Sequence, residues 1–143
     1  MIEHVDHIAI AVHDIDASLP YYRDELRLTL AHDELLPDIG VRLAYLQAGN
    51  TMVQLVQPTR DGAVAHFLAA RGEGLHHICF AVDDIPAVLG RLKGEEDAQV
   101  FMGGRERRCA FLLNQPNGLI TELTETSPLA MRVDARVMER IAE

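Results

Sequence analysis

Apolar and polar residues of this chain occur in blocks that predict strands and helices in the same order twice. Residues 5–12 are almost wholly apolar, a pattern typical of a strand buried on both faces. Asp14 follows as a predicted N-cap, and apolar residues then recur at helical spacing over 15–26. A hairpin around a Gly-Asn turn is predicted next, with strands at 41–46 and 52–56. The first half is expected to form a βαβββ module, of which these segments supply the helix and three strands.

The same order of elements returns after a short helix in the middle of the chain. The segment 64–70 has a helical pattern and ends at Gly72, close to the start of the second module. A strand, a helix and three strands are then predicted at 75–82, 85–92, 98–102, 107–113 and 118–124. We expect a single domain over 1–143, with module one at about 3–58, a linker helix at about 62–72, module two at about 74–125 and a C-terminal helical tail at about 128–142.

An internal repeat supports this division. The stretch from His7 to Ala17 returns seventy residues later from His77 to Ala87, with seven of eleven positions identical. The repeat continues in later strands, where Met52-Val53-Gln54-Leu55 matches Ile120-Thr121-Glu122-Leu123 and Leu43-Ala44-Tyr45-Leu46 matches Cys109-Ala110-Phe111-Leu112. Each half thus contributes one histidine and one amide or carboxylate, a set that favours a metal site. The alternative is that both histidines are core residues bonded to backbone carbonyls.

Composition narrows the classes of partner. The chain has 143 residues, of which 48% are hydrophobic, so one core is sufficient. A formal net charge of −9 disfavours nucleic acid and anionic membrane surfaces as partners. Cys79 and Cys109 lie in apolar runs without a close partner in sequence, which predicts reduced thiols and a cytoplasmic location. The sequence shows neither a leader-like N-terminus nor an apolar run of about 18 residues, so we expect a soluble protein that is not exported.

Three segments resemble a known family. They are Asp6–Val12, Gly40-Val41-Arg42 and Phe67–Ile78, and they are similar to the vicinal oxygen chelate (glyoxalase/bleomycin resistance/dioxygenase) superfamily. The third segment resembles the methylmalonyl-CoA epimerase branch in particular. The resemblance covers roughly 3–125 and implies an α+β fold, in which two tandem βαβββ modules form a cupped, partly open mixed β-barrel with flanking helices.

The resemblance also implies a metal centre. It assigns His7, Gln54, His77 and Glu122 as ligands of one divalent ion, with two positions left for water or substrate. Imidazole, amide and carboxylate donors suit octahedral Co, Ni, Mn or Zn better than a closed thiolate site would. No other cofactor is expected.

The activity implied is that of a metal-dependent isomerase. Such an enzyme abstracts the α proton of an acyl-CoA, for example methylmalonyl-CoA, through a metal-stabilised enolate. Glu122 is the expected base. The chain departs from the family in having Leu43 and Gln54 where its members carry a second carboxylate. Tyr45, on the same strand face as Leu43, would supply the second proton-transfer group unless it is a core residue, and Glu34 is close in sequence but outside that strand.

Other features leave alternatives open. Arg105, Arg107 and Arg108 form a basic cluster that would bind coenzyme A phosphates, or else would be a solvated strand edge. The partner expected is a small acyl-CoA or related thioester, bound by a homodimer whose site lies within one chain or is shared across the dimer. A glyoxalase-I-like lyase, a ligand-binding protein of the bleomycin-resistance kind and, more weakly, a ring-cleaving dioxygenase are the alternative functions.

Overall fold

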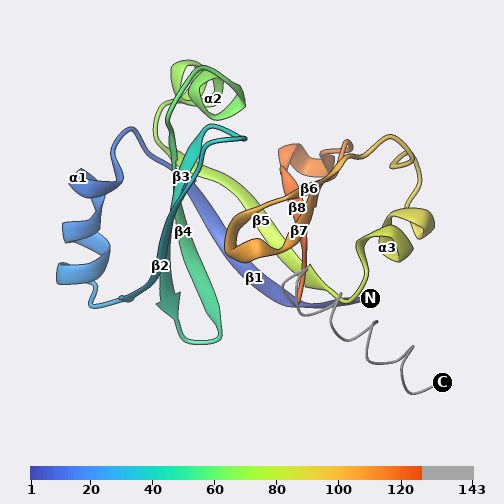
Figure 1. Cartoon of the computed structure of the whole chain (residues 1–143), viewed down its shortest axis with the longest axis horizontal. Coiled ribbons are helices and arrows are strands. Elements are labelled where there is room, and N and C mark those ends of the chain that lie inside the picture. Colours follow the sequence, from blue (N-terminus) through green and yellow to red (C-terminus); the bar gives the residue numbers. More distant parts are fainter. Residues whose placement is uncertain (127–143) are drawn as a thin grey trace. The chain divides into compact units, whose positions relative to one another are not determined.

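The computed structural model describes residues 1–126 (Figure 1). The predicted tail helix at about 128–142 lies outside the described residues. The elements are β1 (Ile2–Ala11), α1 (Ile15–Leu19), a π-helical turn (Pro20–Glu25), β2 (Thr29–Leu36), β3 (Val41–Ala48), β4 (Thr51–Pro58), α2 (Ala63–Arg71), β5 (Gly74–Val82), α3 (Ile85–Arg91), β6 (Val100–Met102), β7 (Arg108–Phe111) and β8 (Thr121–Glu125), with 3-10 turns at Gly104–Glu106 and Pro116–Gly118. None of the helices in this described part is long and apolar enough to cross a membrane.

The described chain forms two compact units. The first unit is Val5–Cys79, and the second is Met1–His4 together with the chain from Phe80 onward. Strand order in the first unit is β2-β3-β4-β1-β5, with β1 parallel to β4 and with β3 antiparallel to both β2 and β4. In the second unit the end of β5 is followed by β8, β7 and β6, the last three antiparallel. Mixed strands with packed helices confirm the predicted α+β class and the order of the βαβββ modules.

Helix α1 begins where the sequence predicts it. The Asp14 side chain accepts hydrogen bonds from the backbone N–H groups of Asp16 and Ala17, which are otherwise unsatisfied in the first turn. Pro20 cannot donate a hydrogen bond, and there the α-helix gives way to the π-helical turn within the predicted 15–26 span. Ile15 and Leu19 bury their side chains against one face of the sheet, made by Ala44, Leu46 and Leu55.

The other face of the first unit carries a second apolar cluster. Its buried members are Ala9, Val41, Leu43, Tyr45 and Val56. Residues 41, 43 and 45 alternate with 42, 44 and 46 along β3, so the two clusters occupy opposite faces of the same strand. Because β1 and β4 pair with each other in register, this second face also carries the side chains of these two strands that the sequence predicts as metal ligands.

Strand β2 has no counterpart among the segments that the sequence predicts as strands. It pairs with β3 in antiparallel fashion, and a bulge between Leu30 and His32 leaves Ala31 as the extra residue. Most of β2 is exposed, because it is an edge strand with polar residues in its centre. The bulge also breaks the alternation of apolar and polar positions by which a strand is recognised. Glu34 therefore lies in β2, where it pairs in register with Leu43 of β3.

The second unit repeats the local design of the first. Asp84 caps α3 by accepting a hydrogen bond from the backbone N–H of Ala87, as Asp14 does for α1. Helix α3 packs on β7 and β8. The apolar core of this unit consists of Val82, Ile85, Val88, Ala110 and Leu123. The register Phe111 to Glu122 repeats the register Tyr45 to Gln54 in the first unit. The repeat seen in the sequence is thus a repeat of strand pairing.

Candidate metal centre

Two buried histidines face each other in the first unit. His7 on β1 and His77 on β5 are 2% and 4% exposed, and their Nε2 atoms are 3.3 Å apart. Two nitrogens bound to one ion at about 2.1 Å, as in zinc sites, are separated by about 3.0 to 3.4 Å for angles between octahedral and tetrahedral. The observed separation fits a shared cation.

The opposite ring nitrogen of each histidine has a partner supplied by the preceding residue. His7 Nδ1 is 2.7 Å from the Asp6 Oδ2 atom, and His77 Nδ1 is 2.7 Å from the Nδ1 of His76. An ionised carboxylate only accepts, so His7 donates from Nδ1 and keeps a lone pair on Nε2. A proton on His77 Nδ1, donated to His76, leaves the same lone pair on the second ring. Two such lone pairs repel each other at this distance, and a cation between them would remove the repulsion.

The amide of Gln54 supplies the third observation. Gln54 is 3% exposed, and its Oε1 atom has no hydrogen-bond partner among the described residues. An unpartnered buried carbonyl oxygen is costly unless something positive satisfies it. On β4, Gln54 is the register partner of Ala9 and of Tyr45, so its side chain lies on the face that carries His7. The donor set of the first unit therefore fits a divalent ion.

Glu122, the remaining predicted ligand, belongs to the second unit. It is a buried residue of β8 and pairs in register with Phe111 of β7. Its position in β8 is equivalent to that of Gln54 in β4, as the sequence repeat predicts. The coordination of an ion by these four residues together stays a prediction.

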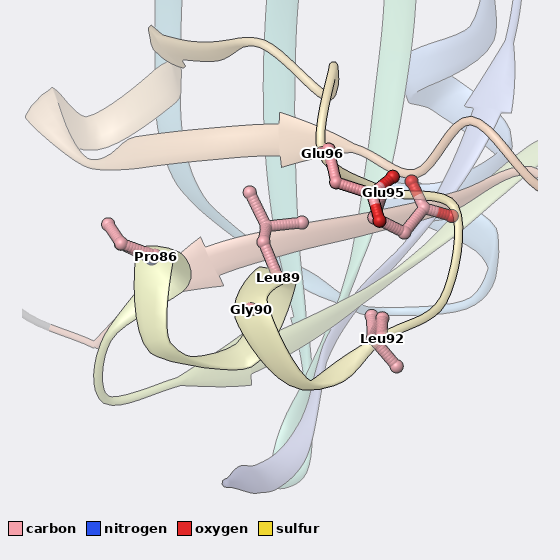
Figure 2. Close-up of a pocket in the computed structure, with 6 residues that line it drawn as sticks. All are labelled: Pro86, Leu89, Gly90, Leu92, Glu95 and Glu96. Carbon is pink, nitrogen blue, oxygen red and sulfur yellow. The ribbon is translucent and has the colours of Figure 1, made fainter.

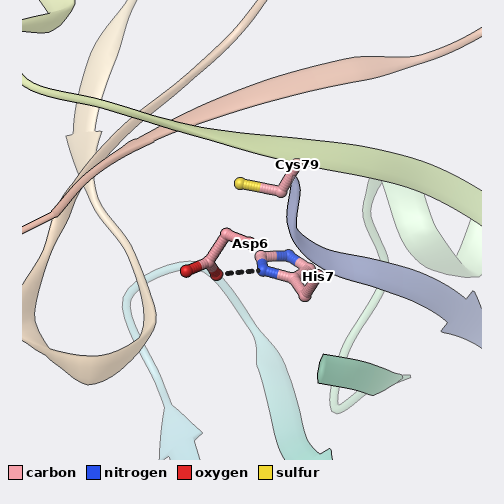
Figure 3. Close-up of side chains that lie close together, drawn as sticks. All are labelled: Asp6, His7 and Cys79. Atoms are coloured by element: carbon pink, nitrogen blue, oxygen red, sulfur yellow. Dashed lines mark hydrogen bonds and ion pairs between the residues drawn. The ribbon is translucent and has the colours of Figure 1, made fainter. Parts of the chain in front are cut away.

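A second group of possible ligand atoms overlaps the histidine pair. The side chains of Asp6, His7 and Cys79 are buried, and their ligand atoms lie within 4.8 Å of one another (Figure 3). The dashed contact in Figure 3 occupies the Nδ1 atom of His7, which a metal bound to this group would have to share. We interpret the group as support for His7, since ligating histidines ordinarily donate their other N–H to a carboxylate or carbonyl. The two cysteines of the chain, Cys79 and Cys109, are buried and form no disulfide in the described part of the chain, in line with the predicted reduced thiols.

Helix α2 holds the second histidine indirectly. The Phe67 ring packs edge-on against the ring of His76 at 4.7 Å between centroids, and the Arg71 guanidinium lies 5.5 Å from the Phe67 centroid. Successive residues of a strand point to opposite faces, yet the rings of His76 and His77 meet through their Nδ1 atoms. Residues 67–78, the segment that resembles the epimerase branch, thus include the side chains that hold the ring of His77 in place.

Tyr45 lies between two histidines. Its ring centroid is 5.6 Å from that of His7 in an edge arrangement and 6.0 Å from that of His32. His32 in turn approaches Glu34, with Nε2 and Oε1 3.3 Å apart. Sequence reasoning missed His32 and gave Glu34 no place in a strand. No local pattern would have found them, because polar residues occupy 32–34 without alternating with apolar ones.

The three arginines of the basic cluster differ in their contacts and exposure. Arg108 makes two hydrogen bonds with the carboxylate of Glu125, which is fully buried and also accepts from the backbone N–H of Ile85. These bonds raise the pKa of Arg108 above its ordinary value. Arg105 and Arg107 lie in and after the turn Gly104–Glu106 and are partly exposed. Binding of coenzyme A phosphates by the three arginines stays a prediction. Arg108 already donates hydrogen bonds to Glu125, and it would have to break them to bind a phosphate.

A pocket of about 290 Å³ lies beside α3 in the second unit (Figure 2). It is lined by Pro86, Leu89, Gly90, Leu92, Glu95 and Glu96. The Glu95 carboxylate already accepts hydrogen bonds from the backbone N–H groups of Leu113 and Asn114, at 2.7 and 3.1 Å. The lining combines apolar surface with carboxylates and contains no nucleophile or cation, so it does not compete with the histidine pair as a reaction site.

The chain is similar to known proteins over most of its length. Residues 6–111 match the model of the Glyoxalase/Bleomycin resistance protein/Dioxygenase superfamily. The chain is 37% identical over 134 residues to the ethylmalonyl-CoA/methylmalonyl-CoA epimerase of Cereibacter sphaeroides, covering 87% of this chain and 99% of that protein. It is 31% identical to the mitochondrial methylmalonyl-CoA epimerase of Homo sapiens, over 85% of this chain and 73% of that protein.

A solved structure gives the same result. A methylmalonyl-CoA epimerase in complex with methylmalonyl-CoA and NH4+ has a TM-score of 0.80 and 34% identity, covering 89% of this chain and 96% of that one. The predicted resemblance and the epimerase-like class of enzyme are confirmed. The chain belongs to the Glyoxalase/Bleomycin resistance protein/Dioxygenase superfamily and has methylmalonyl-CoA epimerases among its relatives.

Proposed function

We propose that this protein is a metal-dependent epimerase that exchanges the α proton of a branched acyl-CoA, with 2-methylmalonyl-CoA as the first substrate to test. The observation that carries the proposal is the buried pair His7 and His77, with Nε2 atoms 3.3 Å apart and each Nδ1 atom engaged. The unpartnered Oε1 atom of Gln54 supports it. The substrates named for the relatives from Cereibacter and Homo sapiens supply the acyl-CoA class.

In this proposal His7, Gln54, His77 and Glu122 hold one divalent ion, of Co, Ni, Mn or Zn. A bound ion of this kind polarises a carbonyl oxygen as a Lewis acid and so lowers the barrier to removing the neighbouring proton. The protein's own part is to orient the imidazoles through Asp6 and His76 and to exclude water from a buried face.

Glu122 acts as the base in this scheme. A carboxylate of ordinary basicity is sufficient once the adjacent carbonyl is polarised, and the proton that it takes from the α carbon is held on one of its oxygens. Tyr45, packed against His7, is the second residue predicted to take part. The C–H electron pair moves toward the thioester oxygen as the α carbon becomes planar, which is the enolate expected for this chemistry.

Two measurements test the proposal together. Metal content of the purified protein should be one divalent ion per chain and should fall to background in His77→Ala, because one imidazole donor is lost. The metal-loaded enzyme, incubated with (2R)- or (2S)-methylmalonyl-CoA in deuterated water, should replace the α proton with deuterium, as followed by NMR. Absence of exchange from both enantiomers would overturn the proposed function. The predicted homodimer is a separate prediction, checked by light scattering.

A further inference from the structure

We propose that Glu34 is the second acid/base group of the reaction, an inference that rests on the proposed epimerase function. Inversion at a carbon requires a proton to leave one face of the planar intermediate and another to arrive on the opposite face. One carboxylate, Glu122, accounts for one face only. The residue that serves the other face has to carry a titratable group on the sheet face that bears His7 and Gln54.

The bulge in β2 brings Glu34 to that face. Before the bulge, Leu30 pairs with Leu46 and packs in the cluster under α1. After the bulge, His32 pairs with Tyr45, and Leu36 packs in the cluster on the opposite face. Without the bulge, regular alternation from Leu30 would place His32, Glu34 and Leu36 on the α1 side of the sheet.

An independent contact confirms this orientation of β2. Asp33 hydrogen-bonds to Arg42, which also pairs with Asp16 of α1 at 3.0 Å. Asp33 is therefore on the α1 side. Its neighbour Glu34 lies on the other side, opposite Leu43, because successive residues of a strand alternate.

The position of Glu34 suits proton transfer better than that of Tyr45. Tyr45 is only 1% exposed and is packed between the rings of His7 and His32. The Glu34 side chain is 21% exposed, so it is more accessible than that of Tyr45. His32 Nε2 lies 3.3 Å from Glu34 Oε1 and limits where the carboxylate points. Glu34 lies on β2 and Gln54 on β4, two strands away. Adjacent strands are about 4.7–4.9 Å apart, so the lateral distance between the two backbones is about 10 Å. A bound acyl chain and the glutamate side chain together span this distance.

The proton bookkeeping of this step closes without another reactant. One carboxylate takes the α proton, and the C–H electron pair moves onto the thioester oxygen. The carboxyl group on the other face then gives its proton to the same carbon, while that pair returns to form the new C–H bond. Each group recovers its starting state by exchanging one proton with water.

The test compares the two enantiomers separately in deuterated water, using metal-loaded enzyme. In Glu34→Gln, inversion should fall by about 100-fold, the lower range of what a positioned acid/base group contributes. One enantiomer should still exchange its α proton without inverting, and the other should not exchange. Glu34→Asp should restore part of the inversion, and metal content should match the unchanged protein in both variants.

Asp33→Asn is the matched control, since it removes a carboxylate from the same strand on the opposite face and should leave inversion intact. Undiminished inversion in Glu34→Gln, or loss of exchange from both enantiomers, would overturn the inference. So would Tyr45→Phe showing the one-enantiomer result in its place. If the unchanged enzyme exchanges neither enantiomer, the proposed function itself fails and the role of Glu34 falls with it.

Discussion

The two βαβββ modules share a frame and a histidine at equivalent positions, but they differ in the residues around that histidine pair. Both begin with a histidine strand, both cap the next helix with an aspartate, and both place the later ligand candidate on the strand that follows the hairpin turn. At equivalent positions, however, the first module has Asp6 and Gln54 while the second has His76 and Glu122. The duplicated backbone thus sets where the candidate ligands lie, and the substitutions between the copies change the charge of that set.

The second strand of each module differs in the same way. Strand β2 has eight residues and a bulge, whereas β6 has three. Only the longer strand carries a carboxylate at a position that the bulge turns toward the histidine face.

The largest expected effect concerns two arginines that occupy equivalent positions, Arg42 in β3 and Arg108 in β7. Arg108 pairs with a fully buried Glu125, whereas the partners of Arg42 are exposed to solvent. Arg108→Met should lower the free energy of unfolding by about 3 kcal/mol, because it leaves a buried carboxylate without its partner. Arg42→Met should cost below about 1 kcal/mol. Urea denaturation followed by circular dichroism checks both, and equal costs would show that the two arginines are equivalent after all.

The next effect separates the two supports of the histidine rings. Asp6→Asn should weaken metal affinity by about 10- to 100-fold, because a carboxylate that orients a ligating imidazole is replaced by a neutral amide. His76→Gln should have a smaller effect, since the partner of His77 Nδ1 is another imidazole nitrogen and not a carboxylate. Competition with a fluorescent chelator measures both. A larger loss in His76→Gln would mean that the second module, not the first, controls the ion.

A smaller effect is expected where the modules differ in ligand charge. A divalent ion held by one glutamate and three neutral ligands has a net charge of +1. In Gln54→Glu a second carboxylate would bring this net charge to zero. We expect tighter metal retention by the order of tenfold, or about 1.4 kcal/mol. The measurement is the rate of metal loss to a chelator. Weaker retention in Gln54→Glu would contradict a ligand role for this residue, because a second carboxylate should not loosen a site that it joins.

The sequence predicted the shared frame well and the asymmetry poorly. The helix starts at Asp14 and Asp84 and the paired histidines follow from local pattern and repeat, because each depends on residues close in sequence. The strand around Glu34 was missed, since an exposed edge with a bulge loses its alternation. The contact of His76 with His77 was also missed, because it depends on ring rotation and on packing against Phe67 from α2.

The smallest effect is a dependence of stability on pH that the first module should show. Hydrogen bonding from Arg42 holds the pKa of Asp33 below its usual value. A carboxyl with a lowered pKa in the folded state contributes stability above its unfolded pKa, near 3.9, and that contribution disappears as pH falls through the lower folded value. Asp33→Asn should therefore be less stable than the unchanged protein at pH 7 by below about 1 kcal/mol. The two proteins should converge as the medium is made more acidic than pH 4. Thermal melting at several pH values measures the difference, and a gap that stays constant down to acid would show that the Asp33 charge contributes nothing.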